Sequence, residues 1–208
     1  PYTTLFRSDQ SWLEQYGLIR EVDEKAEPSN TIYRRRFLKA FFKESKVFTD
    51  IDDKGYYTPD GFLNMMSILL DFEDYIMQIG VNAFYAPGKP YEKTGQFLLT
   101  AWLYQFVEAG RGDLRYEVPS GLGWMDLLLT YGDRKYIIET KINRPNLERT
   151  LEKAVDQVNG KYLSAEKADE GYIVIFDPLK KVGEVVMPRE LKVNGRTLTV
   201  FAPGIGRG

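Results

Sequence analysis

Three residues of this chain combine side-chain types and a spacing that could carry out chemistry: Asp126, Glu139 and Lys141. They lie in two apolar, aromatic-rich runs, 123–131 and 134–142, which are separated by a Gly-Asp pair. This pattern predicts two antiparallel strands joined by a tight two-residue turn. Counting outward from the turn places Asp126 directly opposite Glu139, where like charges destabilise a sheet unless something neutralises them. Lys141 follows Glu139 by two positions, so it points to the same face.

Two carboxylates and one ammonium group on a sheet face suit the hydrolysis of a phosphodiester. Mg²⁺ accepts a few carboxylate oxygens and shares its remaining positions between water and phosphate. The metal polarises the phosphoryl oxygen and activates a bound water, and a neighbouring lysine can hold that water or offset charge on phosphorus. The strand pattern alone leaves a second interpretation open, in which Glu139 and Lys141 are solvated edge charges and Asp126 merely opens a turn.

The segment Asp126 to Lys141 resembles the D…(D/E)xK signature of the PD-(D/E)xK nuclease superfamily, with Glu139-Thr140-Lys141 following an apolar strand. The proline of the signature is absent, as it commonly is in this superfamily, and Met125 precedes Asp126. The resemblance implies that Asp126 and Glu139 ligate Mg²⁺, with Mn²⁺ expected to substitute. It also implies that the Thr140 carbonyl adds an oxygen and that Lys141 positions or activates the water.

Flanking residues extend this resemblance. Glu92 opens an apolar helical stretch, as in members in which a helix-borne glutamate contributes to the metal site. It could equally be a favourable charge at a helix N-terminus. Gln157 and Tyr162 resemble the Gln…Tyr motif of one superfamily branch, although they are one residue farther apart than in that motif. The resemblance implies a catalytic role for Gln157, which would steady the substrate or the active-site strand, and substrate contacts for Tyr162, Lys161 and Arg144.

The order of expected elements indicates the α/β class. We expect, in chain order, a helix near 91–109, strands near 114–118, 123–131 and 135–142, a helix near 147–164, a strand near 171–176 and a hairpin at 190–201 that turns at Asn194-Gly195. Helix, three-strand meander, helix and strand is the order of a restriction-endonuclease-like core. Upstream, Thr58-Pro59 predicts the start of another helix, because a capping residue precedes proline at the first helical position.

The N-terminal part adds a second resemblance. The segments 12–20 and 30–33 resemble the winged-helix end of bacterial AAA-like ATPases that carry this nuclease at their C-terminus. The chain has no G-x-x-x-x-G-K-[ST] motif, so it is not the ATPase itself, and we expect it to be the C-terminal part of an ATPase–nuclease protein whose ATPase domain is missing. We therefore divide the chain into 1–8, which matches a translated sequencing adapter, a partial winged helix at 9–58, a helical connector at 59–85 and the nuclease domain at 86–208.

Composition narrows the possible chemistry. The 208 residues are 43% hydrophobic and 14% aromatic, which is enough to bury one good core. No run approaches the roughly 20 apolar residues of a membrane span, and the N-terminus has no signal-peptide layout, so we expect a cytoplasmic location without membrane contact. The absence of Cys and His excludes disulfides, zinc–thiolate sites and catalysis by histidine. Hydrolysis must therefore use carboxylates, lysine, tyrosine and an oxygen-bound metal.

Net charge gives DNA binding little support, because the formal charge is −2 and the isoelectric point is about 5.5. DNA-binding domains are usually basic. Residues 134–167 nevertheless contain eight basic and five acidic side chains, and Arg34, Arg35 and Arg36 form a second basic group. We expect a metal-dependent endodeoxyribonuclease-like enzyme that acts on DNA. The alternatives are a catalytically inactive DNA-binding or protein-interaction module on the same fold, and a winged-helix regulator that binds through Arg34–Arg36.

Overall fold

The computed structural model describes residues 15–22, 25–29, 55–86, 89–107, 112–120, 123–144, 146–168, 170–184 and 188–207. The chain divides into two compact units, Pro1–Thr49 and Asp50–Gly208. Residues 1–8 and the basic group Arg34, Arg35 and Arg36 lie outside the described residues. The predicted boundaries at 58 and 85 stay predictions, and both fall inside the second compact unit.

The described part of the first unit is a small hairpin. Strand β1 (Ile19–Val22) pairs antiparallel with β2 (Lys25–Pro28), from Ile19 opposite Pro28 to Val22 opposite Lys25. This hairpin lies within residues 9–58, which we expected to form a partial winged helix. The remainder of the predicted winged helix lies largely outside the described residues.

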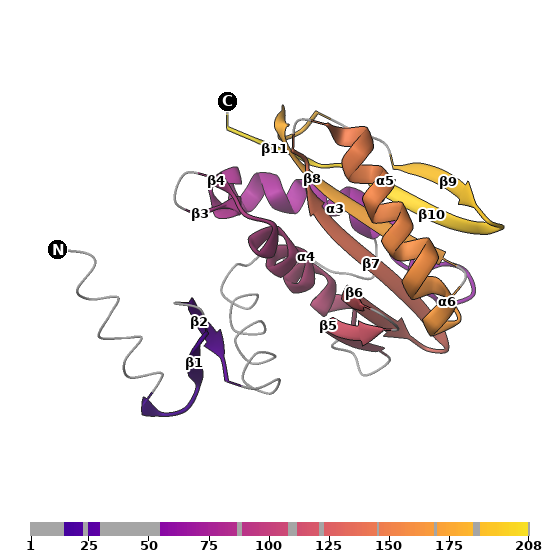
Figure 1. The fold of residues 1–208 in the computed structure, drawn as a ribbon, viewed down its shortest axis with the longest axis horizontal. Coiled ribbons are helices and arrows are strands. Elements are labelled where there is room, and N and C mark those ends of the chain that lie inside the picture. The colour runs from indigo at the N-terminus through magenta and orange to yellow at the C-terminus, as the bar shows by residue number, and fades with distance from the viewer. Residues whose placement is uncertain are drawn as a thin grey trace. The chain divides into compact units, whose positions relative to one another are not determined.

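The second unit is built on a mixed sheet, which confirms the predicted α/β class (Figure 1). Within the described residues this sheet has seven strands, six of them in the order β5-β6-β7-β8-β10-β9, with β11 pairing to β8. The strands are β5 (Gly112–Ser120), β6 (Gly123–Tyr131), β7 (Arg134–Ile142), β8 (Glu170–Lys181), β9 (Arg189–Val193), β10 (Arg196–Phe201) and β11 (Gly204–Gly206). Strands β5, β6 and β7 form an antiparallel meander, β8 runs parallel to β7, and β10 runs parallel to β8.

Helices cover the two faces of this sheet. The helices are α3 (Met65–Ile79), the short 3₁₀ helix η2 (Val81–Phe84), α4 (Glu92–Val107), α5 (Leu147–Gln157), the π-helix η3 (Val158–Tyr162) and α6 (Leu163–Glu166). A two-residue hairpin, β3 (Tyr85–Ala86) with β4 (Lys89–Pro90), precedes α4. From α4 to β8 the order is helix, three-strand meander, helix and strand, as the sequence predicts.

Alternating strand side chains give each face its own core, because successive residues of a strand point to opposite faces. On one face Ile137 and Ile173 pack with Leu151 and Val158 from the α5 side, and Figure 1 shows α5 lying across the sheet. On the other face Phe176 contacts Phe72 of α3. A Cβ at Gly95 of α4 would lie 2.4 Å from the Phe176 ring, so glycine is what lets α4 approach β8.

The predicted helix start at Thr58-Pro59 is wrong. Helix α3 begins at Met65, and its N-cap is Asn64, whose side chain accepts a hydrogen bond from Ser67 N. Residues before it form a turn in which Phe62 N donates to Thr58 Oγ1, at 3.1 Å, and Leu63 bridges back to Tyr57. The Thr58 hydroxyl therefore caps a turn rather than a helix, which is the other common use of this side chain. No helix of the described residues is long and apolar enough to cross a membrane.

Candidate active site

Strands β6 and β7 separate at Asp126. Their ladder has the predicted register from Tyr131 opposite Arg134 to Leu127 opposite Ile138, and it ends there. The predicted ladder pair between Asp126 and Glu139 does not form. Instead, Asp126 Oδ2 accepts hydrogen bonds from Thr140 N at 2.8 Å and from Thr140 Oγ1 at 2.7 Å. A side-chain carboxylate thus satisfies a backbone N–H that would otherwise lack a partner on this side of β7.

The backbone around Asp126 is constrained from the other side as well. The β5–β6 ladder omits the position between Tyr116 and Val118, where Glu117 has a φ of +47°. A non-glycine residue rarely adopts this left-handed conformation, and such strain gathers at functional sites. Glu117 forms an ion pair with Lys93 of α4, and Gln96 Nε2 of the same helix donates to Asp126 O at 3.2 Å. Asp126 is therefore held by contacts with β7 and α4, beside the kink in β5.

Glu139 is a buried carboxylate with one unsatisfied oxygen. Its side chain is 1% exposed, and Oε1 accepts from Lys141 Nζ at 2.5 Å. Oε2 has no hydrogen-bond partner among the described residues. Burial raises the pKa of Glu139 to about 7, and the neighbouring Asp126 carboxylate acts in the same direction, against Lys141. An orphaned, buried carboxylate oxygen beside a second carboxylate is an environment that a cation would stabilise.

Lys141 joins this carboxylate to the backbone. Its Nζ donates to Glu139 Oε1 and also to Thr140 O, at 3.1 Å. Burial acts to lower the pKa of Lys141, but the charges of Glu139, Asp126 and Glu92 outweigh burial and raise it. Lys141 is therefore an ammonium group at neutral pH, which suits it to donating hydrogen bonds and offsetting negative charge rather than to accepting a proton.

Oxygen donors in this arrangement fit a hard divalent cation such as Mg²⁺. Asp126, Glu139 and the Thr140 carbonyl lie together, as the sequence predicts. Glu92 lies beside Lys141, and its Oε2 accepts from Ile142 N at 3.2 Å. Among the described residues, no three acidic side chains are grouped closely enough to hold a metal ion as they stand. A metal role for Glu92 therefore stays a prediction.

Gln157 and Tyr162 come together because the helix changes type between them. On an α-helix, residues five apart point about 140° away from each other. Residues 158–162 instead form a π-helix, whose wider turn reduces this divergence, and the Gln157 side chain lies near enough to the Tyr162 hydroxyl to act on its pKa, in the lowering direction. Tyr162 Oη donates to Trp124 O at 2.7 Å. Tyr162, expected to contact substrate, is 1% exposed, so in this conformation it binds the chain itself and anchors the start of β6.

A family model for a domain of unknown function, DUF8371, matches residues 62–179, which is more than half of the chain. The chain belongs to the DUF8371 family. No curated protein matches it. The DUF8371 segment runs from just before α3 into β8, so it contains every residue predicted to take part in catalysis.

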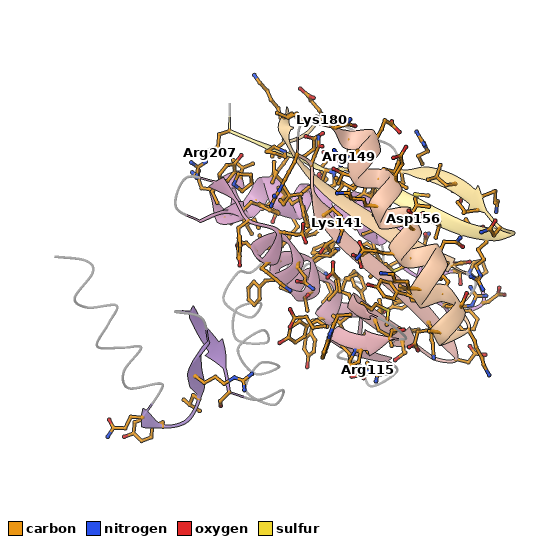
Figure 2. The ribbon with its side chains drawn as sticks, viewed as in Figure 1. Arg115, Lys141, Arg149, Asp156, Lys180 and Arg207 are labelled. Atoms are coloured by element: carbon orange, nitrogen blue, oxygen red, sulfur yellow. The ribbon has the colours of Figure 1, made fainter. Side chains whose placement is uncertain are left out.

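A pocket of about 530 Å³ adjoins this site within the DUF8371 segment. Its cationic lining consists of Lys141, Arg144, Arg149 and Lys153. The rest of its lining is Glu92, Ile142, Asn146 and Thr150. Figure 2 shows Arg149 near the start of α5 and Lys141 on the adjacent sheet, with Asp156 farther along the helix. Arg144, predicted to bind substrate, thus lies in the pocket wall.

Lys161, the other predicted substrate contact, is exposed and lies beside the start of β6. A Cβ at Gly123 would be 3.9 Å from Lys161 Cδ. Arg144 follows the C-terminal end of β7 and Lys161 lies near the N-terminal end of β6, which is the same end of this antiparallel pair, but Lys161 is not part of the pocket lining.

Several residues of the site were missed from sequence. They are Gln96, Glu117, the Thr140 side chain, Arg149 and Lys153. A signal existed for two pairs, because Gln96 follows Glu92 by four residues and Lys153 follows Arg149 by four, and such residues share a helix face. The backbone conformation of Glu117 and the hydrogen bonds of Thr140 depend on the divergence of β6, for which the sequence carries no local signal.

Proposed function

We propose that this chain is a metal-dependent nuclease that hydrolyses phosphodiester bonds in DNA. The observation that carries the proposal is the position of Asp126, Glu139 and Lys141 at the point where β6 and β7 separate, with Glu139 Oε2 buried and unsatisfied. The order of elements from α4 to β8, with β8 parallel to β7, supports a restriction-endonuclease-like core.

Each residue has a role that follows from its contacts. Asp126 and Glu139 would hold Mg²⁺ or Mn²⁺, with the Thr140 carbonyl beside them. When bound, such a cation polarises a phosphoryl oxygen and lowers the pKa of a bound water. Asp126 also keeps Thr140 in place through two hydrogen bonds.

The Lys141 ammonium group donates one hydrogen bond to Glu139 Oε1 and another to Thr140 O. An ammonium group at this point stabilises the negative charge that develops on the phosphoryl oxygens. Gln157 lies near the Tyr162 hydroxyl, which in turn holds the start of β6, so we assign Gln157 to positioning the active-site strand.

The test is cleavage of plasmid, linear duplex and single-stranded DNA with Mg²⁺, Mn²⁺ or EDTA, using the wild type and Lys141→Ala. We expect metal-dependent cleavage that falls by about 10²–10³-fold in Lys141→Ala, the size typical of losing one group that stabilises transition-state charge. Lys135→Ala is the matched control, because Lys135 lies on the same strand but pairs with Glu166. Cleavage that persists in EDTA, or that survives Lys141→Ala unchanged, would contradict the proposal.

One observation favours the second candidate, a non-catalytic DNA-binding module. The ion pair between Lys141 and Glu139 already offsets much of the charge at the site. DNA binding in EDTA, without cleavage in any metal and without Mn²⁺ binding at Asp126 and Glu139, would support this module. The ATPase partner expected from the upstream segment belongs to the nuclease proposal, and a folded protein that binds Mn²⁺ without cutting would indicate dependence on it.

A further inference from the structure

The basic pocket beside Lys141 has a charge excess that the catalytic site does not use. Four cationic side chains line it, and Glu92 supplies its one carboxylate among the described lining residues. Glu92 Oε2 is already engaged by Ile142 N. We propose that this pocket binds a phosphate group of the DNA strand next to the phosphate that is cleaved. The inference rests on the proposed function, and it adds a strand-holding site to it.

Three of the four cations of the pocket are uncompensated within the described part of the chain. Arg144, Arg149 and Lys153 form no ion pair with any described residue, whereas Lys93 and Lys135, elsewhere on the same unit, pair with carboxylates. Arg149 and Lys153 are four residues apart on α5, and like charges at this spacing destabilise a helix. An anion between them removes that cost, which is the arrangement expected of a phosphate site.

The lining recognises charge rather than a base. Its described residues include no aromatic side chain on which a nucleobase could stack, and its one apolar side chain is Ile142. Asn146 Oδ1 accepts from Arg149 N at 3.0 Å, and Thr150 Oγ1 donates to Asn146 O at 3.1 Å. These bonds fix the first turn of α5, from which Arg149 projects. Recognition by this pocket is therefore independent of sequence, as contacts to the phosphate backbone are.

The pocket and the catalytic site are adjacent, and one side chain, Lys141, belongs to both. Lys141 lines the pocket and also donates to Glu139 Oε1. A strand whose reactive phosphate lies at Asp126 and Glu139 therefore has a neighbouring phosphate beside Arg144, Arg149 and Lys153. This phosphate comes either from a strand end or from the interior of the strand, and both present the same oxygens.

Binding without cleavage tests the inference directly. Fluorescence anisotropy of labelled single-stranded DNA is measured in EDTA, over a series of salt concentrations, for the full chain and for the double variant Arg149→Gln/Lys153→Gln. Both side chains are exposed, so the variant should fold, and its thermal unfolding checks this. The matched control is Arg189→Gln/Lys192→Gln, which removes two exposed cations from β9 at the far edge of the sheet.

We expect the pocket variant to bind at least about tenfold more weakly, with the control close to the wild type. The slope of log affinity against log salt should fall by about 0.7, because the pocket contacts one phosphate and each phosphate contact on single strands contributes about 0.7. Loss on circular as well as linear strands assigns the pocket to an interior phosphate. Loss confined to strands with a terminal phosphate assigns it to an end. Equal losses in the pocket and control variants, or no loss on any strand, would overturn the inference.

A second variant distinguishes a failure of the proposed nuclease function from a failure of the phosphate site. Asp126→Asn changes a catalytic carboxylate outside the pocket lining, so it should abolish cleavage in Mg²⁺ while leaving the EDTA binding and its dependence on Arg149 and Lys153 intact. If the wild type neither cleaves DNA nor binds Mn²⁺ at Asp126 and Glu139 but still binds DNA through the pocket, the nuclease proposal fails and the phosphate site stands.

Discussion

The two ends of the β6–β7 strand pair differ in how their backbone groups are hydrogen-bonded. Near the turn, from Tyr131 and Arg134 to Leu127 and Ile138, backbone pairs with backbone in an unbroken register. Beyond Leu127 the strands separate, the Asp126 carboxylate accepts a hydrogen bond from the β7 backbone, and one oxygen of the buried Glu139 has no partner among the residues that the structure describes. The first region has the pairing of an ordinary stable hairpin. The second accepts a cost in stability, which is the pattern expected where a site needs charged groups under cover.

The largest expected effect comes from removing the Asp126 carboxylate, which accepts hydrogen bonds from Thr140 where β6 and β7 separate. Asp126→Ala should reduce cleavage by about 10³-fold, because a metal ligand is lost. It should also lower the free energy of unfolding by about 1–3 kcal/mol, because Thr140 N loses its partner. Asp126→Asn keeps an acceptor oxygen, so it should recover most of the stability and little of the activity. Denaturant unfolding and cleavage assays separate the two effects, and equal stability of Asp126→Ala and wild type would sink this account of the gap.

Glu139 should make the stability of the protein depend on pH at the end of the strand pair where β6 and β7 separate. The end near the turn should show no such dependence. Its pKa is raised from 4.5 to about 7, so the metal-free folded protein retains this proton over a range in which the unfolded chain has lost it. The contribution of Glu139 to stability should therefore be fully present below about pH 4.5 and be lost as the pH rises through 7, by an amount on the order of 3 kcal/mol.

Glu139→Gln removes this titration, so the variant should be more stable than the metal-free wild type at pH 8 and similar to it at pH 4. Thermal unfolding at both pH values in EDTA measures the difference. Glu148→Gln, which removes an exposed carboxylate from α5, is the control. A variant that is less stable than the wild type at pH 8 would show that Glu139 stabilises the fold, contrary to this interpretation.

The smallest effect is expected at the turn. Gly132 has a φ of +61°, so Gly132→Ala should cost about 1 kcal/mol through backbone strain and leave cleavage unchanged. A Cβ there would lie 3.5 Å from Phe62, an ordinary contact, so strain is the expected cause. Gly160→Ala is the control, since no atom lies within 4 Å of the added carbon and φ is not positive. Chemical denaturation should rank the two variants, and a loss of cleavage in Gly132→Ala would show that the turn contributes to the site.

Local rules predicted the regular parts of the fold. The strand bounds of β6, the Gly132-Asp133 turn and the register as far as Leu127 all follow from period-two patterning and turn chemistry. The second hairpin turns at Asn194-Gly195, where both residues have positive φ, as this turn type requires.

Tertiary contacts decided the rest. The sequence does not show that α4 reaches Asp126 through Gln96, because that contact joins residues 30 positions apart. It also does not show which charges remain unpaired: Arg144 was assigned to substrate binding by resemblance, while Arg149 and Lys153 were counted without a role. Thr58-Pro59 was misread because the same capping hydroxyl serves turns and helices equally well.

The π-helix at residues 158–162 has a consequence for how the chain tolerates changes in length. An α-helix that gains one residue must rotate everything beyond it by about 100°. Here the wide turn takes up the extra residue, so Val158 at its start and Leu163 just after it remain in one hydrophobic cluster. A Cβ added at Gly160, within that turn, would face open space. We therefore expect the connection from β7 to β8 to tolerate the deletion of Gly160, with both strands keeping their places in the sheet.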